Sequence, residues 1–364
     1  QLDTTTADLV KSINESSSYI ISVDVPTGLD SCTGSLLPIS INCDLLITLL
    51  SYKKGLFTHK GRDTWKNLLY SRLIDDDITA NNYLVTANDD FYPSLNKENI
   101  IIKDFKKCNQ HSTHKKSNGV SCIVAGEFPY HGALIMSCHA AIKTGCQYLH
   151  SISEEEYAHS LPIIMPEVIS TSFSHSDFNK EIKQFSNVLI GPGITTKGKE
   201  YVNIALDNLD NLDSLIIDAG GLSHINTSNQ YSKKLIITPH PGEAAKLLSI
   251  SPSEVQADRY QSAMELYNLL NCIVVLKGSG TIIYDGKNFY TCMDGNYNMA
   301  VAGMGDILSG ILLRELSSPL DRLDACLKSV VYHSYSSDYL LTQCRNKNYR
   351  PSMIPETYSE LTSL

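Results

Sequence analysis

Short apolar runs alternate with longer amphipathic runs through most of the chain after residue 119, and this alternation restricts the possible folds more than any other feature. The apolar runs predict buried strands at 120–125, 147–151, 187–190, 215–217, 235–238 and 273–276. The longer runs predict helices at 132–144, 252–270 and 320–341. Because strands that alternate with helices form a mainly parallel sheet covered on both faces, the sequence predicts a doubly wound α/β domain over residues 118–345.

A glycine-rich loop precedes a further amphipathic run in this domain. Residues 301–310 read VAGMGDILSG, in which Gly303 and Gly305 remove side chains where phosphates could approach the backbone. Unpaired N–H groups at the start of a helix bind phosphate oxygens, and a carboxylate beside them can take a proton from an attacking hydroxyl. We therefore interpret Asp306 as a catalytic base. The alternative is that Asp306 only caps a helix after a glycine turn.

Three more loops of unusual composition follow predicted strands. They lie in VLIGPGITTKG (188–198), LIITPHPGEAAKLL (235–248) and IVVLKGSGTII (273–283). Open α/β sheets bind ligands at the carboxyl ends of their strands, where these loops are expected to lie. His240 is fixed between two prolines, and Lys277 offers a point charge beside the Ser279 and Thr281 hydroxyls. A structural histidine and a tight Gly-Pro-Gly turn are the alternatives.

The composition excludes several classes of function. The net charge of −9 and the pI near 5.6 argue against a surface for nucleic acid or anionic membranes. The ten cysteines form no Cys-x-x-Cys pair, which favours buried free thiols in a reducing compartment. Without a signal-like start or a long apolar run, we expect a soluble cytoplasmic protein. Cys108, His111 and His114 have metal-like spacing but no fourth nearby ligand.

The start of the chain carries a second candidate site. A predicted strand at 19–23 ends in VDVPTGLDSCTG (23–34). A carboxylate at the end of a strand, followed by a Pro-Thr-Gly turn with exposed oxygens, suits an acid/base and cation site, although Asp24 can equally be the cap of an ordinary turn. A polar stretch at 86–117 predicts a linker, and residues 346–364 predict a loosely attached tail.

Together with VAGMGDILSG, the three loops resemble in order and wording the carboxy-terminal domain of the bifunctional NAD(P)H-hydrate repair enzymes. That domain is an ADP-dependent dehydratase of the ribokinase-like superfamily. Residues 23–34 and 43–63 resemble the last third of the amino-terminal epimerase domain of the same enzymes. The resemblance divides the chain into a partial Rossmann-like epimerase unit (1–85), a linker (86–117), a dehydratase domain (118–345) and a tail (346–364).

The resemblance implies a reaction and its residues. ADP, with Mg2+, would phosphorylate the hydroxyl of the S epimer of hydrated NADH or NADPH, and loss of phosphate would restore the reduced dinucleotide. Asp306 would be the base. The implied nucleotide-binding residues are Lys277, Gly278, Ser279, Gly280, Thr281 and Gly305. The implied substrate-binding residues are Ala133, Gly193, His240 and Asp306.

The resemblance also assigns the N-terminal residues and leaves alternatives open. Asp24 would contact the substrate of the epimerase and Thr27 would hold a potassium ion, but the nucleotide loop of that domain is not among these residues, so we expect incomplete epimerase activity. A homo-oligomer is expected. Lys116, Gly220 and Asn298 depart from the family pattern. A ribokinase-like kinase of a vitamin-precursor alcohol and a non-catalytic nucleotide-binding interaction protein remain the alternatives.

Overall fold

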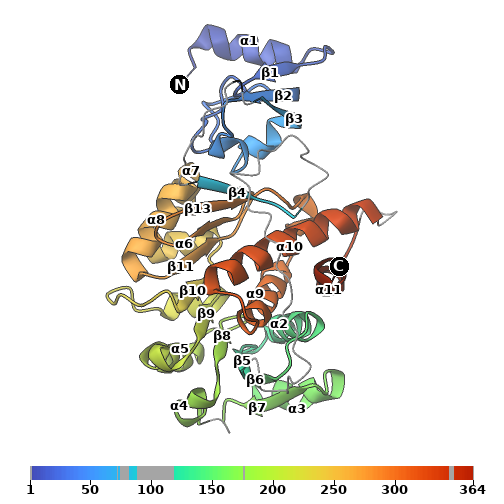
Figure 1. The fold of residues 1–364 in the computed structure, drawn as a ribbon. Coiled ribbons are helices and arrows are strands. Elements are labelled where there is room, and N and C mark those ends of the chain that lie inside the picture. Colours follow the sequence, from blue (N-terminus) through green and yellow to red (C-terminus); the bar gives the residue numbers. More distant parts are fainter. Residues whose placement is uncertain are drawn as a thin grey trace.

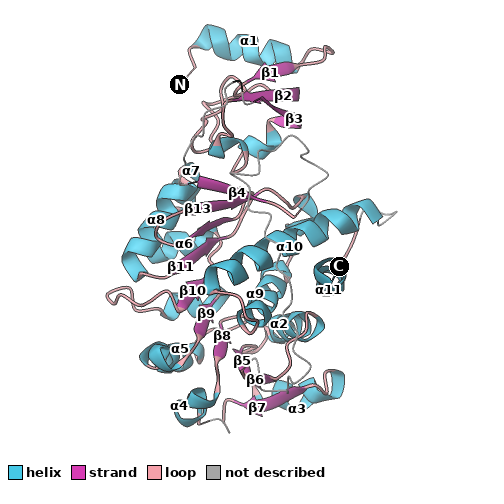
Figure 2. Ribbon diagram, viewed as in Figure 1, coloured by secondary structure: helices cyan, strands magenta, loops and turns pink. Residues whose placement is uncertain are grey.

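The computed structural model describes residues 2–71, 73, 82–87, 119–174, 177–343 and 348–363. The predicted linker after residue 87, with Cys108, His111, His114 and Lys116, lies outside these ranges. Figure 1 shows a small N-terminal unit stacked on one end of a long twisted sheet, and Figure 2 shows the helices that cover the sheet. Within the described ranges, no helix is both long and apolar enough to cross a membrane.

The N-terminal unit is a three-stranded parallel sheet with one long helix. Its elements are α1 (Thr4–Asn14), β1 (Ile21–Val23), β2 (Cys43–Leu49), η1 (Lys54–Leu56), η2 (Gly61–Asp63) and β3 (Trp65–Ser71), with β2 in the centre of the sheet. Asp3 caps α1 by accepting a hydrogen bond from the Thr6 N–H at 2.9 Å. A small apolar cluster that includes Leu46, Phe57 and Trp65 holds the unit together.

The remaining strands form one ten-stranded sheet in the order β4-β13-β12-β11-β10-β9-β8-β5-β6-β7. Their bounds are β4 (Asn82–Val85), β5 (Ser121–Val124), β6 (Leu149–Ser153), β7 (Val168–Ser172), β8 (Asn187–Ile190), β9 (Ser214–Ile217), β10 (Leu235–Ile237), β11 (Ile273–Leu276), β12 (Ile282–Tyr284) and β13 (Phe289–Cys292). Only the β11–β12 and β12–β13 pairings are antiparallel. All six predicted strands are confirmed, and the doubly wound α/β class with them.

The central strands β8 to β11 are mainly apolar because both faces of the sheet are buried there. Along β8, Val188 and Ile190 face one core while Leu189 faces the other. The first core lies beneath α4 (Phe178–Glu181), α5 (Gly198–Asp207), α6 (Pro241–Leu248), α7 (Pro252–Ala257) and α8 (Arg259–Leu270). The second lies beneath α2 (His131–Lys143), α3 (Glu155–Ile164), α9 (Met304–Leu316) and α10 (Arg322–Gln343).

Two predictions about helices were wrong. The single helix predicted over 252–270 is broken at Asp258, whose backbone is extended and whose carboxylate caps α8 by accepting from the Gln261 N–H at 2.9 Å. The tail is not loosely attached, because residues 354–363 form α11 (Ile354–Ser363) against α2 and α9. Ile354 and Tyr358 are buried there, and the Tyr358 hydroxyl donates to Glu315 at 2.7 Å.

Candidate active site

Helix α9 begins at the glycine loop, as predicted, and places Asp306 in its first turn. The N-cap is Gly303, whose φ of 92° lies in the left-handed region that glycine adopts without strain. Asp306 is therefore three residues inside the helix and is not its cap. The Ser137 hydroxyl of α2 donates to the Asp306 carbonyl at 3.2 Å, which fixes the start of α9 against α2.

The Asp306 carboxyl group lies in a charged and largely buried environment. Its pKa is raised to about 6 by burial, the largest cause, and by the nearby Asp218 and Glu243 carboxylates, while Lys277 opposes them. A carboxyl with a pKa near 6 is ionised at neutral pH and still basic enough to accept a proton. Asp306 thus has the protonation behaviour of a general base.

Lys277 and Asp218 form a buried ion pair beside this carboxyl. The Lys277 Nζ lies 2.6 Å from Asp218 Oδ1, and the Ser309 hydroxyl of α9 donates to the other oxygen. Burial disfavours the charged form of each group, but the attraction between the two charges and their hydrogen bonds outweigh it. The pKa of Asp218 is therefore lowered and that of Lys277 is raised. A Cβ on Gly305 would lie 3.4 Å from Lys277 Nζ, so the ammonium group reaches the start of α9.

His240 and Glu243 build the start of α6 as a capping box. His240 Nδ1 accepts from the N–H groups of Gly242 (2.9 Å) and Glu243 (3.3 Å), and a Glu243 carboxylate oxygen accepts from the His240 N–H at 2.7 Å. Because Nδ1 is an acceptor, the neutral ring carries its proton on Nε2. The His240 side chain remains 56% exposed, so the residue has a structural role and still faces the cavity described next.

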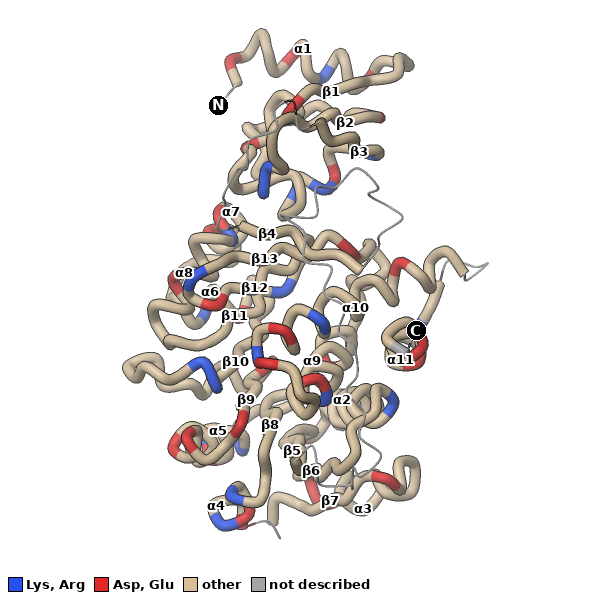
Figure 3. Tube along the Cα trace, in the orientation of Figure 1, with Lys and Arg blue, Asp and Glu red and all other residues tan. Residues whose placement is uncertain are grey.

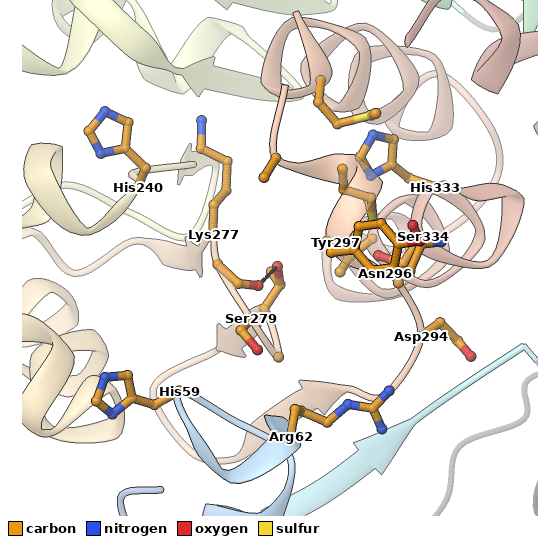
Figure 4. A pocket seen from close by; sticks show the side chains of 18 of the residues that line it. His59, Arg62, His240, Lys277, Ser279, Asp294, Asn296, Tyr297, His333 and Ser334 are labelled. Carbon is orange, nitrogen blue, oxygen red and sulfur yellow. Dashed lines mark hydrogen bonds between the residues drawn. The ribbon is translucent and has the colours of Figure 1, made fainter. Parts of the chain in front are cut away.

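A cavity of about 920 Å³ opens beside these groups. Its lining residues come from 59–63, 256–259, 277–281, 293–301 and 304–308, together with His240 and with Val330, His333 and Ser334 of α10. All six predicted nucleotide-binding residues line it, as Figure 4 shows for Lys277 and Ser279. Ala133, Gly193 and Asp306 are not among the lining residues. A Cβ on Gly193 would lie 3.2 Å from Ala133 Cβ, so these two lie together on the α2 side of α9.

The glycines of the 277–281 loop are required by protein contacts. A Cβ on Gly278 would lie 2.4 Å from Arg259 Nη1, and one on Gly280 would lie 1.9 Å from the Phe57 carbonyl oxygen. Both residues have positive φ values, 144° and 63°. Close packing with α8 and with the N-terminal unit therefore accounts for both glycines before any ligand is considered.

The sequence profile described as NAD(P)H-hydrate dehydratase matches residues 121–359. This chain belongs to that family. The profile of the YjeF-related protein N-terminus matches residues 1–55. The bifunctional NAD(P)H-hydrate repair enzyme of Vibrio cholerae is 32% identical over 336 residues, which cover 91% of this chain and 65% of that protein. The Escherichia coli enzyme of the same name is 30% identical over 92% of this chain and 63% of its own length. The chain thus spans just under two thirds of these relatives.

Solved structures show the same fold for the dehydratase region. A ribokinase-like superfamily protein of Enterococcus faecalis matches with a TM-score of 0.68 and 21% identity over 80% of this chain and 98% of its own. The ADP/ATP-dependent NAD(P)H-hydrate dehydratase of Bacillus subtilis, co-crystallised with ATP and Mg2+, matches with a TM-score of 0.61 and 24% identity over 70% and 93% of the two chains. The predicted family and the ribokinase-like fold are confirmed.

The two predicted epimerase residues lie in the N-terminal unit, apart from the cavity. Asp24 follows β1 with a φ of 68°, forms an ion pair with Lys53 and accepts from the Leu49 N–H at 3.1 Å. Thr27 is exposed, and its carbonyl accepts from the Ile41 N–H at 2.9 Å. The structure brings neither residue to Asp306. Their epimerase and potassium roles stay predictions.

The departures from the family pattern have local explanations where the structure describes them. A Cβ on Gly220 would lie 1.8 Å from the Ile194 carbonyl oxygen, so the close approach of that backbone leaves no room for a side chain. The Asn298 N–H donates to Asn296 Oδ1 at 3.0 Å within the short helix η6 (Tyr297–Met299). Packing therefore explains the glycine at 220, whereas the contact at 298 uses only the backbone and does not explain the asparagine side chain.

Three acidic residues near the site were not singled out from the sequence. Glu127 is buried and accepts from the N–H groups of Thr196 (3.0 Å) and Gly198 (2.9 Å), which fixes the loop after Gly193. Glu243 is the third residue of α6, whose N-cap is His240. The spacing of a capping box was the sequence signal that could have identified Glu243. Burial raises the pKa of Asp294, at the cavity wall, to about 7. Nothing local in the sequence marks that residue.

Proposed function

We propose that this chain dehydrates the S epimer of hydrated NADH or NADPH, with ADP as the phosphoryl donor. The observation that carries the proposal is the Asp306 carboxyl, with a pKa raised to about 6, in the first turn of α9 next to the cavity that the 277–281 loop lines. Membership of the NAD(P)H-hydrate dehydratase family supports the same reaction.

The proposed chemistry replaces a poor leaving group with a good one. Asp306 takes the proton of the substrate hydroxyl, and the oxygen attacks the terminal phosphorus of ADP, so that AMP departs. The resulting phosphate ester then loses phosphate, together with a proton from the neighbouring ring carbon, which restores the double bond of the reduced nicotinamide. The N–H groups at the start of α9 and the Lys277 ammonium lie where negative charge develops on the transferred group.

The donor set suits Mg2+ bound with a nucleotide. Among the residues that the structure describes, no three His, Cys, Asp or Glu side chains converge as a metal site. Mg2+ is usually held by one or two carboxylates together with the substrate's own phosphates, and Glu243 is the carboxylate near Lys277 that is neither paired with it, as Asp218 is, nor proposed as the base. When bound there, the ion would neutralise phosphate charge. Potassium belongs to the proposal only for Thr27 and the epimerase reaction.

The decisive experiment incubates the protein with the S hydrate of NADH, ADP and Mg2+. We expect the absorbance of NADH to return, with one AMP and one phosphate released for each NADH formed. The reaction should require ADP. A stable phosphorylated product, or rapid phosphorylation of a vitamin-precursor alcohol, would favour the small-molecule kinase. ADP binding without turnover of any hydrate would favour the non-catalytic alternative.

A further inference from the structure

One wall of the cavity comes from the N-terminal unit. His59, Lys60, Arg62 and Asp63, around η2, line the same cavity as the 277–281 loop. In Figure 4, the side chains of His59 and Arg62 extend from a ribbon segment of the N-terminal unit. This stretch lies between the two regions, 1–55 and 121–359, that the family profiles match. Its place at the cavity follows from the structure alone.

Backbone contacts fix this stretch against the 277–281 loop. The Thr58 hydroxyl and the His59 N–H both donate to the Ser279 carbonyl, each at 3.3 Å. The Phe57 carbonyl takes the space that a side chain on residue 280 would need, since a Cβ there would lie 1.9 Å from its oxygen. These contacts join the loop to the N-terminal unit, and a shift of either would break them.

Further contacts hold the N-terminal unit against the helices that flank β11. The Tyr260 hydroxyl of α8 donates to the Lys54 carbonyl at 3.4 Å, and Lys54 Nζ lies 4.2 Å from the centre of the Tyr260 ring. The Ser35 hydroxyl donates to the Ala257 carbonyl at the end of α7 at 3.2 Å. Several basic residues of the unit lie on the side that faces the ten-stranded sheet (Figure 3). The chain as a whole is acidic, so these basic residues concentrate positive charge on the side of the N-terminal unit that faces the sheet.

The two ends of the cavity differ in chemistry. In Figure 4, His240 and the ammonium end of Lys277 lie on one side, and His59 and Arg62 lie on the opposite side. Phosphates favour the first side, where Lys277 reaches the start of α9. A nucleotide whose terminal phosphate lies there extends its ribose and base toward the segment 59–63. The N-terminal unit consequently faces the nucleoside end of the ligand.

Arg62 has the geometry to contact that end. Its guanidinium lies 5.0 Å from the centre of the Trp65 ring, which supports the long side chain. Its charge also lies close enough to Asp294 and Asp338 to lower the pKa of each, although burial, the larger effect, raises both. A planar guanidinium held at a cavity wall can stack on a purine ring or donate to ribose hydroxyls and ring nitrogens.

We propose that Arg62 of the N-terminal unit binds the nucleoside end of ADP, so that the nucleotide site of the dehydratase domain is completed by the unit that precedes it. The proposal rests on the proposed function, because it takes ADP as the ligand of this cavity. It makes the N-terminal unit a determinant of nucleotide affinity and base preference. The chemical step remains with Asp306.

The test compares Arg62→Ala with Lys66→Ala, both measured by calorimetry with ADP and with AMP. Lys66 is a matched control because it lies in the same unit, its side chain is 75% exposed, and it pairs with Asp44 at 2.7 Å away from the cavity. We expect Arg62→Ala to weaken both nucleotides about tenfold and by equal factors, since AMP and ADP share the nucleoside end. Lys66→Ala should bind both as the parent does.

Kinetics and a conservative variant separate binding from a structural effect. Arg62→Ala should raise the KM for ADP about tenfold and change kcat much less, whereas a displaced catalytic domain would lower kcat. Arg62→Lys keeps the charge but loses the planar fork, and it should recover only part of the affinity. If Arg62→Ala does not fold, Arg62→Lys alone tests the proposal. Parental ADP affinity in Arg62→Lys would then overturn the proposed contact between Arg62 and the nucleoside.

Equal affinity of Arg62→Ala and the parent for ADP and AMP would overturn the proposal and leave the proposed function intact. A penalty clearly larger for ADP than for AMP would place Arg62 at the phosphates and overturn the assignment to the nucleoside end. A parent protein that binds neither nucleotide would instead overturn the proposed function.

Discussion

The two walls of the cavity are built in different ways. Behind the α9 wall, Asp218 and Asp306 lie next to Lys277 and are mostly buried, and the charges of the three residues shift one another's pKa values. At the wall from the N-terminal unit, His59 and Arg62 are half-buried and are positioned by backbone contacts. Charges act strongly on a reacting group only where water is excluded. The first wall is thus suited to chemistry and the second to holding the nucleotide.

The largest expected effect on turnover comes from removing the carboxylate of Asp306. Asp306→Asn keeps the shape but cannot accept the hydroxyl proton, so turnover of the S hydrate should fall about 10²- to 10⁴-fold while ADP binding persists. Asp210→Asn, an exposed change on the far side of the sheet, is the matched control. Single-turnover measurements at saturating ADP check the prediction, and near-normal turnover would remove Asp306 from the mechanism.

The next largest effect is expected where the two walls meet. Gly280→Ala places a Cβ 1.9 Å from the Phe57 carbonyl oxygen at a φ of 63°, so it should lower the free energy of unfolding by about 1–3 kcal/mol and weaken ADP binding. Urea unfolding with and without ADP measures both effects.

Gly132→Ala is the control for this substitution. No atom lies within 4 Å of a Cβ at position 132, and the residue is in α2, where alanine favours the helix. Its stability should equal or slightly exceed that of the parent. If Gly280→Ala were as stable as this control, the close approach of the two units would not hold in solution.

A smaller effect on kcat/KM is expected from pH, through the base beside the α9 wall. The pKa of Asp306 is raised to about 6 by burial, Asp218 and Glu243, and the base must be ionised to act. As the pH falls below 6, kcat/KM should therefore fall, approaching about tenfold per pH unit. A pH profile of kcat/KM for the S hydrate at fixed ADP saturation tests this. A profile that stays flat down to pH 4.5 would contradict the assigned base.

The sequence allowed the α9 wall to be predicted more fully than the other wall. Strands such as β8 and β9 are buried at every position and mainly apolar because both faces are covered, and loops at their carboxyl ends are where ligands bind. Those local patterns led to Asp306, His240 and the 277–281 loop. The pairing of Lys277 with Asp218 was not predictable, because 59 residues separate them and no local pattern encodes the contact.

A local helix cap and long-range packing account for the errors and omissions. Asp258 breaks the predicted helix because its carboxylate caps α8, although the helical pattern continues on both sides of it. The attachment of α11 depends on the buried Tyr358–Glu315 hydrogen bond across 43 residues. The approach of Phe57 to Gly280 joins positions more than 200 residues apart, so the glycines of 277–281 were attributed to ligand phosphates when packing against protein also requires them.

The smallest effect is expected at Asp24, the residue of the N-terminal unit that the resemblance singles out. Its side chain is 44% exposed and tied to Lys53, and it is not among the residues that line the cavity. A partly exposed ion pair near the surface contributes only about 0–1 kcal/mol, so Asp24→Asn should change folding little and leave S-hydrate dehydration unchanged. These 364 residues should also consume the R hydrate no faster than it epimerises in a protein-free control, since the Asp24 carboxylate is tied to Lys53 and lies apart from the cavity. A chromatographic time course of both epimers with ADP and Mg2+ measures this. R-hydrate loss faster than the control, and slowed by Asp24→Asn, would show instead that the N-terminal unit has a working active site in addition to its wall of the nucleotide cavity.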